Sequence, residues 1–282
     1  NDNVWNSWTD NIFRQLYQAT KYALSNEGTD IAKSMQVQAL SRQEKVLELT
    51  HDLSKDKVLK YLRQFPIEYL NHYQAEDISW HARNILRFTN SEAPLILFSQ
   101  KPNVGTELMV YYKSNTPMVF GNIARTMAIK QLNVFSAQVF ITHNFHALCT
   151  IMFQNKKGMP LDHDRLNNLR KAIIAGLDDH SQTLDISAST RQIFEIPTKI
   201  SFLENMSKKQ TNLEISTLDR QGLLAKIGIT LGSLDCLIRA ARITTTGERA
   251  DDFFAITDVN GLPLAPSKKE ELSAALKAAL DG

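Results

Sequence analysis

The chain has 282 residues, long enough for about two domains of ordinary size. Its 32 basic and 30 acidic side chains give a net charge of +2, which argues against a dedicated nucleic-acid-binding protein, because such proteins usually present a strongly basic face. Hydrophobic residues make up 43% of the chain, so wholesale disorder is excluded and a sizeable core is expected.

The sequence also predicts a cytoplasmic protein that does not insert into a membrane. It has no run of about 18 apolar residues, which a transmembrane helix requires. Its first residues lack the basic and apolar regions of a signal peptide and lack Met, so we expect a fragment or a processed product. The two cysteines, Cys149 and Cys236, offer neither a disulfide framework nor a zinc cluster and are expected in the core.

The first 93 residues are predicted to be helical. Apolar residues recur at spacings of three and four over 5–17, which gives one apolar face. Further helices are expected over 30–51 and about 75–87, with a break at Pro66, because the residue before proline avoids the helical region. The residues of the 30–51 helix that we expect to be buried are Ile31, Met35, Leu40, Val46, Leu47 and Leu49.

A strand-rich pattern begins at Leu95 and then repeats. Apolar runs and helical spacing predict elements in the order strand, helix, strand, strand, helix, twice over. A constant offset of 104 residues superposes 115–152 onto 219–256 and pairs Met109 with Leu213 and Tyr111 with Ile215. The strands are expected at 95–98, 109–112, 139–141, 147–153, 213–218, 237–245 and 252–257, and the helices at 117–131, 162–177, 222–234 and 268–280.

The predicted fold class is therefore α+β, with an all-helical N-terminal segment followed by two ferredoxin-like βαββαβ domains. A strand at 196–202, after a polar linker, is expected to complete the first domain, and no fourth strand is visible for the second. The expected domains are residues 1–93, 94–208 and 209–282.

One loop between a strand and a helix, Asp219–Leu223, has the chemistry of a binding site. Asp219 can cap the helix, and Gly222 lets the backbone approach a ligand because it lacks a Cβ atom. The exposed N–H groups at the helix N-terminus suit the α-carboxylate of a free amino acid. A capped helix with a small packing residue explains the same pattern, so both interpretations stay open.

The loop Asp219-Arg220-Gln221-Gly222-Leu223 resembles the D-R-P-G-L signature of ACT domains, which sense amino acids. The run at 241–249, followed by Asp252-Phe253-Phe254, is similar to the last ACT repeat of the bifunctional uridylyltransferase/uridylyl-removing enzymes. Stretches 5–8, 16–20 and 80–83 resemble helices that follow the HD phosphohydrolase domain there. The resemblance covers nearly the whole chain.

This resemblance implies a regulatory region that senses L-glutamine and controls uridylylation and deuridylylation of the PII signalling protein. It implies no catalytic or metal site in this chain, while the parent enzyme would use magnesium. The pairs His51-Asp52 and His163-Asp164 spell the HD dipeptide, but we expect coincidence because a metal site needs a full ligand set.

The first repeat departs from the ACT signature. Asn115-Thr116-Pro117-Met118 stands where Asp219–Gly222 stands in the second repeat, and Met118 would fill the space that a ligand needs. Asn133 matches an asparagine that contacts the ligand in many ACT domains, and its counterpart is Leu237. We therefore predict a composite site in which the repeats pack side by side with continuous sheets and Asn133 faces the Asp219–Gly222 loop. The predicted amino-acid-binding residues are Asn115, Thr116, Pro117, Met118, Asn133, Asp219, Arg220, Gln221, Gly222 and Leu223.

Two other functions remain open at this point. The ACT pair could be an interaction or dimerisation module without a ligand, which Met118 and Leu237 favour, or the ACT tail of another metabolic enzyme. Pairing of the sheets would also allow a homodimer. RNA binding is disfavoured, because 240–244 and 253–257 lack the aromatic and basic pattern of RNA-recognition strands.

Overall fold

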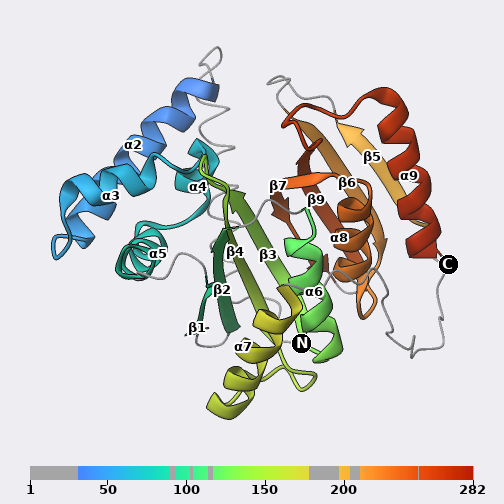
Figure 1. The fold of residues 1–282 in the computed structure, drawn as a ribbon, viewed down its shortest axis with the longest axis horizontal. Helices are drawn as coiled ribbons and strands as arrows, with labels where there is room; N and C mark the ends of the chain where they lie inside the picture. The colour runs from blue at the N-terminus through green and yellow to red at the C-terminus, as the bar shows by residue number, and fades with distance from the viewer. Residues whose placement is uncertain are drawn as a thin grey trace. The chain divides into compact units, whose positions relative to one another are not determined.

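Figure 1 shows the fold in a computed structural model of the chain. The structure describes residues 31–88, 93–101, 104–113, 117–177, 197–203, 210–246 and 248–281, so the helix predicted over 5–17 lies outside the described residues. The chain divides into two compact units. One consists mainly of the N-terminal helices, and the other contains both repeats.

The described part of the helical unit contains four helices. The predicted helices are confirmed as α2 (Ile31–Leu49) and α5 (Ala75–Arg87). Two short helices between them, α3 (Lys55–Leu62) and α4 (Ile67–His72), were not predicted, and Pro66 stands at the start of α4. Among the expected buried residues of α2, Val46 is buried, Met35 and Leu47 are partly buried, and Leu40 and Leu49 are exposed; the Ile31 side chain is not described.

Aromatic side chains and one histidine form the centre of this unit. The Phe65 and Tyr69 rings stack with their centroids 4.1 Å apart. The Tyr69 hydroxyl lies 2.9 Å from the Tyr61 hydroxyl and 3.0 Å from Nδ1 of His81. His81 is fully buried, and its Nε2 has no hydrogen-bond partner. Burial lowers the pKa of His81 from 6.5 to about 3, so the imidazole is neutral in the fold.

The helical unit should therefore lose stability in acid. Below pH 6.5 the unfolded chain binds a proton at His81 that the folded chain does not bind, so the stability present above pH 6.5 falls as the pH approaches 3. At pH 5 the expected loss is about 2 kcal/mol. Urea unfolding followed by tryptophan fluorescence, which reports Trp80 beside His81, measures it. A His81→Leu variant should lack this part of the pH dependence, and an equal slope in the variant would contradict the assignment.

Both repeats contribute to one sheet, with strand order β1-β2-β4-β3-β7-β9-β6-β5 and with β8 paired to β9. β3 and β7 meet where Gln138 pairs with Arg242, so the two sheets are continuous. The elements of the first repeat are β1 (Leu95–Lys101), β2 (Gly105–Lys113), α6 (Val119–Ile129), β3 (Asn133–Ile141), β4 (His146–Gln154) and α7 (His163–Leu177). Those of the second are β5 (Lys199–Leu203), β6 (Thr211–Leu218), α8 (Leu223–Ser233), β7 (Leu237–Arg242), β8 (Thr245–Thr246), β9 (Arg249–Thr257) and α9 (Pro266–Asp281).

The two ferredoxin-like units are confirmed, but the position of their edge strands was predicted wrongly. β5 pairs with β6, for example Ile200 with Ile215, so it completes the second unit and not the first. β1 occupies the corresponding edge of the first unit, beside β2. In each repeat the edge strand precedes the other elements along the chain. A domain boundary at 208/209 would separate β5 from the sheet to which it is hydrogen-bonded.

The strand registers also correct the offset between the repeats. Ala137 pairs with Ile151 in the first repeat, and Ala241 pairs with Phe254 in the second. The offset of 104 therefore holds for β3 and β7 but becomes 103 for β4 and β9. Cross-strand pairing similarly makes Leu108 and Val110, not Met109 and Tyr111, the counterparts of Leu213 and Ile215. The counterpart of Asp252 is consequently Cys149, because these residues pair with Ile215 and Val110.

The helices α6 and α8 pack against each other and join the cores of the two repeats (Figure 1). Gly121 and Gly228 lie at the contact, where a Cβ atom added to Gly228 would lie 2.6 Å from the Cα of Gly121. The Phe120 ring of α6 meets the Phe254 ring of β9 edge-on, with centroids 6.2 Å apart. The two repeats therefore share one apolar core.

Candidate functional site

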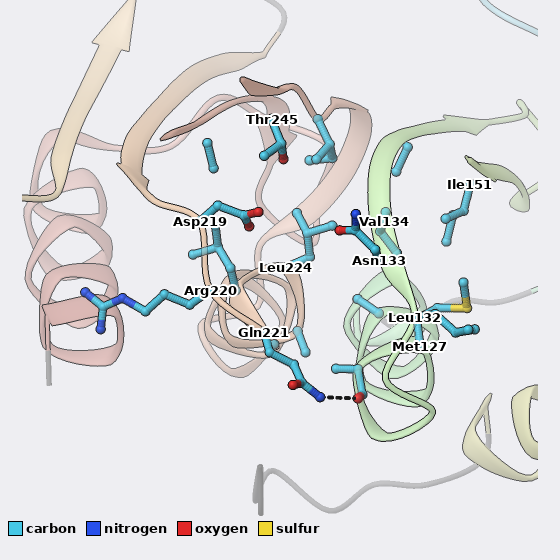
Figure 2. A pocket seen from close by; sticks show the side chains of 18 of the residues that line it. Met127, Leu132, Asn133, Val134, Ile151, Asp219, Arg220, Gln221, Leu224 and Thr245 are labelled. Atoms are coloured by element: carbon cyan, nitrogen blue, oxygen red, sulfur yellow. Dashed lines mark hydrogen bonds between the residues drawn. The ribbon is translucent and has the colours of Figure 1, made fainter. Parts of the chain in front are cut away.

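A pocket of about 200 Å³ lies where the β6–α8 loop of the second repeat approaches the start of β3 in the first repeat. Asn133 and the whole loop from Asp219 to Leu223 line this pocket together, and these are residues of the predicted composite site. Figure 2 shows Asn133 pointing from β3 toward the loop, with Thr245 and Asp219 on the opposite side. Both repeats are needed to form its walls.

The loop conformation depends on Gly222, which stands at the start of α8 with φ 84° and ψ 2°. This left-handed conformation is costly for a residue that carries a Cβ atom. No side chain caps the helix, so the prediction that Asp219 caps it is wrong. The backbone N–H groups of Leu224 and Ala225 belong to the first helical turn, where no intrahelical partner is available, and both residues line the pocket.

The side chains of Gln221 and Arg220 extend from the loop in different directions. Gln221, which replaces the proline of the ACT signature, donates a hydrogen bond from Nε2 to the carbonyl oxygen of Ala128 at 3.1 Å. This bond fastens the loop to α6 of the other repeat (Figure 2). Arg220 extends its guanidinium away from Asn133 in the same view, so it does not close the pocket over a carboxylate.

Two carboxylates line the pocket, and only Asp219 was predicted. Asp252 lies on β9, is fully buried, and has no hydrogen-bond partner at either carboxylate oxygen. Burial raises its pKa from 3.8 to about 7, and Asp219 and Asp251 add to this shift. The nearby Thr244 backbone opposes it, although it makes no hydrogen bond of acceptable geometry to either oxygen. Burial also raises the pKa of Asp219. The sequence signal was an acidic residue among inward-facing apolar neighbours, Ala250 and Phe254.

The described residues of the first-repeat loop, Pro117 and Met118, do not line this pocket. Asn115 and Thr116 lie outside the described residues. Pro117 lines a second pocket of about 270 Å³ at the equivalent place between the first-repeat loop and β7. Met118 packs on α8, since a Cβ atom added to Gly232 would lie 2.2 Å from its sulfur. The second pocket is mainly apolar, and its lining includes Val139, Ile141, Ala147, Cys149, Leu237 and Ile238, with Arg239 as its charged residue.

Within the described part of the chain, neither HD dipeptide belongs to a group of three or more candidate metal ligands. Asp52 forms ion pairs with Arg83 and Arg87, each at 2.9 Å. His163 has its Nδ1 3.0 Å from Nδ2 of Asn167. Among the residues that the structure describes, no group of three or more His, Cys, Asp or Glu side chains could hold a metal ion. Within the same ranges, no helix is long and apolar enough to cross a membrane.

Several proteins with the same description are similar to this chain in sequence. The chain is 31% identical over 98% of its length to the bifunctional uridylyltransferase/uridylyl-removing enzyme of Aliivibrio fischeri. It is 29% identical to the enzymes of the same description from Idiomarina loihiensis and Vibrio cholerae, over 97% and 96% of its length. In all three comparisons the chain spans 32% of the relative.

Other comparisons add little. No protein-family profile matches the chain. A crystal structure of aspartate kinase from Synechocystis is similar over 62% of this chain and 27% of that one, at 12% identity and a TM-score of 0.37. The sequence matches therefore confirm that nearly the whole chain is similar to bifunctional uridylyltransferase/uridylyl-removing enzymes, over about a third of their length.

Proposed function

We propose that this chain is the C-terminal, glutamine-sensing regulatory region of a bifunctional uridylyltransferase/uridylyl-removing enzyme. L-Glutamine would bind between the two repeats, restrain transfer of UMP to the PII protein, and promote removal of the uridylyl group. A ligand can shift an enzyme in this way only if it binds one conformation more tightly than the other. Magnesium would serve the transferase site, outside this chain.

The composite pocket is the observation that supports a sensing role most directly. An α-carboxylate would find unpaired N–H groups at the first turn of α8, beside Leu224 and Ala225. The Asn133 side chain offers both a donor and an acceptor, which suits the side-chain amide of glutamine. Because each repeat provides one part of the site, a bound amino acid would hold the two repeats at a defined spacing.

Calorimetric titration of the chain with L-glutamine tests the proposal. We expect binding, and we expect Asn133→Ala to weaken it about fivefold, since a lost hydrogen bond is worth about 1 kcal/mol. Asn260→Ala, which removes an exposed asparagine in the turn after β9, is the matched control and should bind as the unaltered chain does.

A chain that gives neither heat nor a thermal shift with glutamine would favour an interaction module without a ligand, because a ligand at 100 times its Kd stabilises a protein by about 2.7 kcal/mol. In the whole enzyme, glutamine should lower UMP transfer and raise uridylyl removal. Asn133→Ala should move both responses to higher glutamine concentrations. Unchanged responses in that variant would place the sensor elsewhere in the enzyme.

A further inference from the structure

Asp252 is buried in a way that the fold does not require. The inward-facing residues of β9 are Ala250, Asp252, Phe254 and Ile256, and each of them is almost completely inaccessible to solvent. Both carboxylate oxygens of Asp252 lack a hydrogen-bond partner. Ionised groups at such positions are normally paired, because removing a charge from water is costly. A partner from outside the chain would remove this cost.

The equivalent position in the first repeat shows that an acid is not needed to build the sheet. Cys149 has the same cross-strand relationship to Val110 that Asp252 has to Ile215. Cys149 lines the apolar pocket, just as Asp252 lines the polar one. The two pockets thus occupy equivalent places but differ in chemistry, and the carboxylate belongs to the pocket that also contains Asn133 and Asp219.

The surrounding charges favour a cationic group with several hydrogen-bond donors. Asp219, on the loop, and Asp252, on β9, both line the pocket, and their like charges raise the cost of ionising Asp252. Two carboxylates alone are too few ligands for a metal ion, and the described residues contain no group of three or more His, Cys, Asp or Glu side chains that could hold one. An ammonium group has three donors and one positive charge, so it would satisfy oxygens of both acids at once.

We propose that Asp252 binds the ammonium group of the amino-acid ligand, with Asp219 as the second carboxylate, so that a free amine is obligatory for binding. This inference rests on the proposed sensing function and specifies the orientation of the ligand within the pocket. The ammonium group lies toward β9, and the α-carboxylate lies toward the first turn of α8.

Binding should then release a proton in mildly acidic solution. The charged groups around Asp252 are Asp219 and Arg220 on the loop, Asp251 on its own strand, and Lys156 after β4; Lys156 is exposed, and Arg220 points away from Asn133. With a pKa of about 7, Asp252 is mostly protonated at pH 6 and must ionise to pair with the ammonium group. Affinity should therefore rise about tenfold between pH 6 and pH 8.

The experiment compares glutamine with glutaramate, which is glutamine without its amino group, by calorimetry on the whole chain. The unaltered chain should bind glutamine at least tenfold more tightly than glutaramate. At pH 6, titrations in buffers of different ionisation heat should show release of nearly one proton. Asp252→Asn should lose most of the preference for the amine and the proton release. Asp251→Asn changes an outward-facing neighbour paired with Arg249 at 2.9 Å. It should retain the preference for the amine and most of the proton release, because the Asp251 charge makes the smallest contribution to the raised pKa of Asp252.

The outcomes separate the two proposals. Equal binding of glutamine and glutaramate by the unaltered chain, or undiminished glutamine binding by Asp252→Asn, would overturn the ammonium site while leaving the sensing function in place. If glutamine fails to bind, the same comparison is made with each of the twenty amino acids. Absence of binding by all of them would overturn the sensing function and the ammonium site together.

Discussion

Asp252→Asn is expected to stabilise the ligand-free chain by about 4 kcal/mol at pH 8, because it removes a buried charge without a partner. The pKa of Asp252 is about 7 in the fold and 3.8 ordinarily, so the folded chain holds the proton more tightly than the unfolded chain. The stability that the chain gains from holding a proton on Asp252 is therefore fully present below pH 3.8 and is lost as the pH rises to 7. An asparagine amide carries no charge and avoids this loss.

The pH dependence identifies the cause of the gain. At pH 5 the unaltered chain has lost only about 2 kcal/mol through Asp252, so the advantage of the variant should be smaller there. Hydrogen exchange of the β9 amides is the suitable measurement, because the three tryptophans precede both repeats in the sequence. Asp251→Asn loses an exposed ion pair and should change stability by less than about 1 kcal/mol. A pH-independent gain would exclude ionisation of Asp252 as its origin.

If the Asp252→Asn variant gains stability and loses ligand binding, then Asp252 serves binding at the expense of stability. Binding residues often reduce the stability of the protein that carries them, because their partners arrive only with the ligand. An ammonium group at Asp252 would offset its buried charge. Glutamine should then stabilise the unaltered chain more than the Asp252→Asn variant, although the variant is the more stable protein without ligand.

The local features of this site were predictable from the sequence. The turn at Gly222 is encoded by adjacent residues, and its left-handed conformation is the reason that glycine is present there. Helical spacing and short apolar runs likewise located α6, α8 and most strands of both repeats. The repeat placed Asn133 and the Asp219–Leu223 loop at complementary positions, which is why the composite pocket could be predicted without coordinates.

Features that depend on strand pairing were not predictable in the same way. β5 is short, with alternating partly buried and exposed residues, and nothing in its own sequence distinguishes pairing with β6 from pairing with β2. A shift of one residue in a strand exchanges its inward and outward faces. For that reason the constant offset hid the equivalence of Cys149 and Asp252, and it did not show that Asp251 faces outward while Asp252 is buried.

Gly228→Ala is expected to destabilise the two repeats by about 3 kcal/mol, because overpacking a close contact typically costs 1–3 kcal/mol and backbone cannot move aside as a side chain can. The added Cβ atom would lie 2.6 Å from the Cα and 2.9 Å from the N of Gly121, so α6 and α8 must separate. Alanine is the better helix former by about 1 kcal/mol, so a net loss must come from this contact. Urea unfolding followed by circular dichroism, together with hydrogen exchange of α8, measures the change.

Gly232→Ala is the matched control, since it lies on the same helix but its added Cβ atom would clash only with the flexible side chain of Met118, whose Cα lies at an ordinary contact distance of 3.4 Å. Equal and small effects of the two substitutions would contradict a tight contact between α6 and α8. The same separation should also weaken amino-acid binding, because Ala128 on α6 and Leu224 on α8 both line the pocket and Gln221, just before α8, is hydrogen-bonded to Ala128. The spacing of these helices is therefore the structural variable through which a bound amino acid and the packing of the two repeats would influence each other.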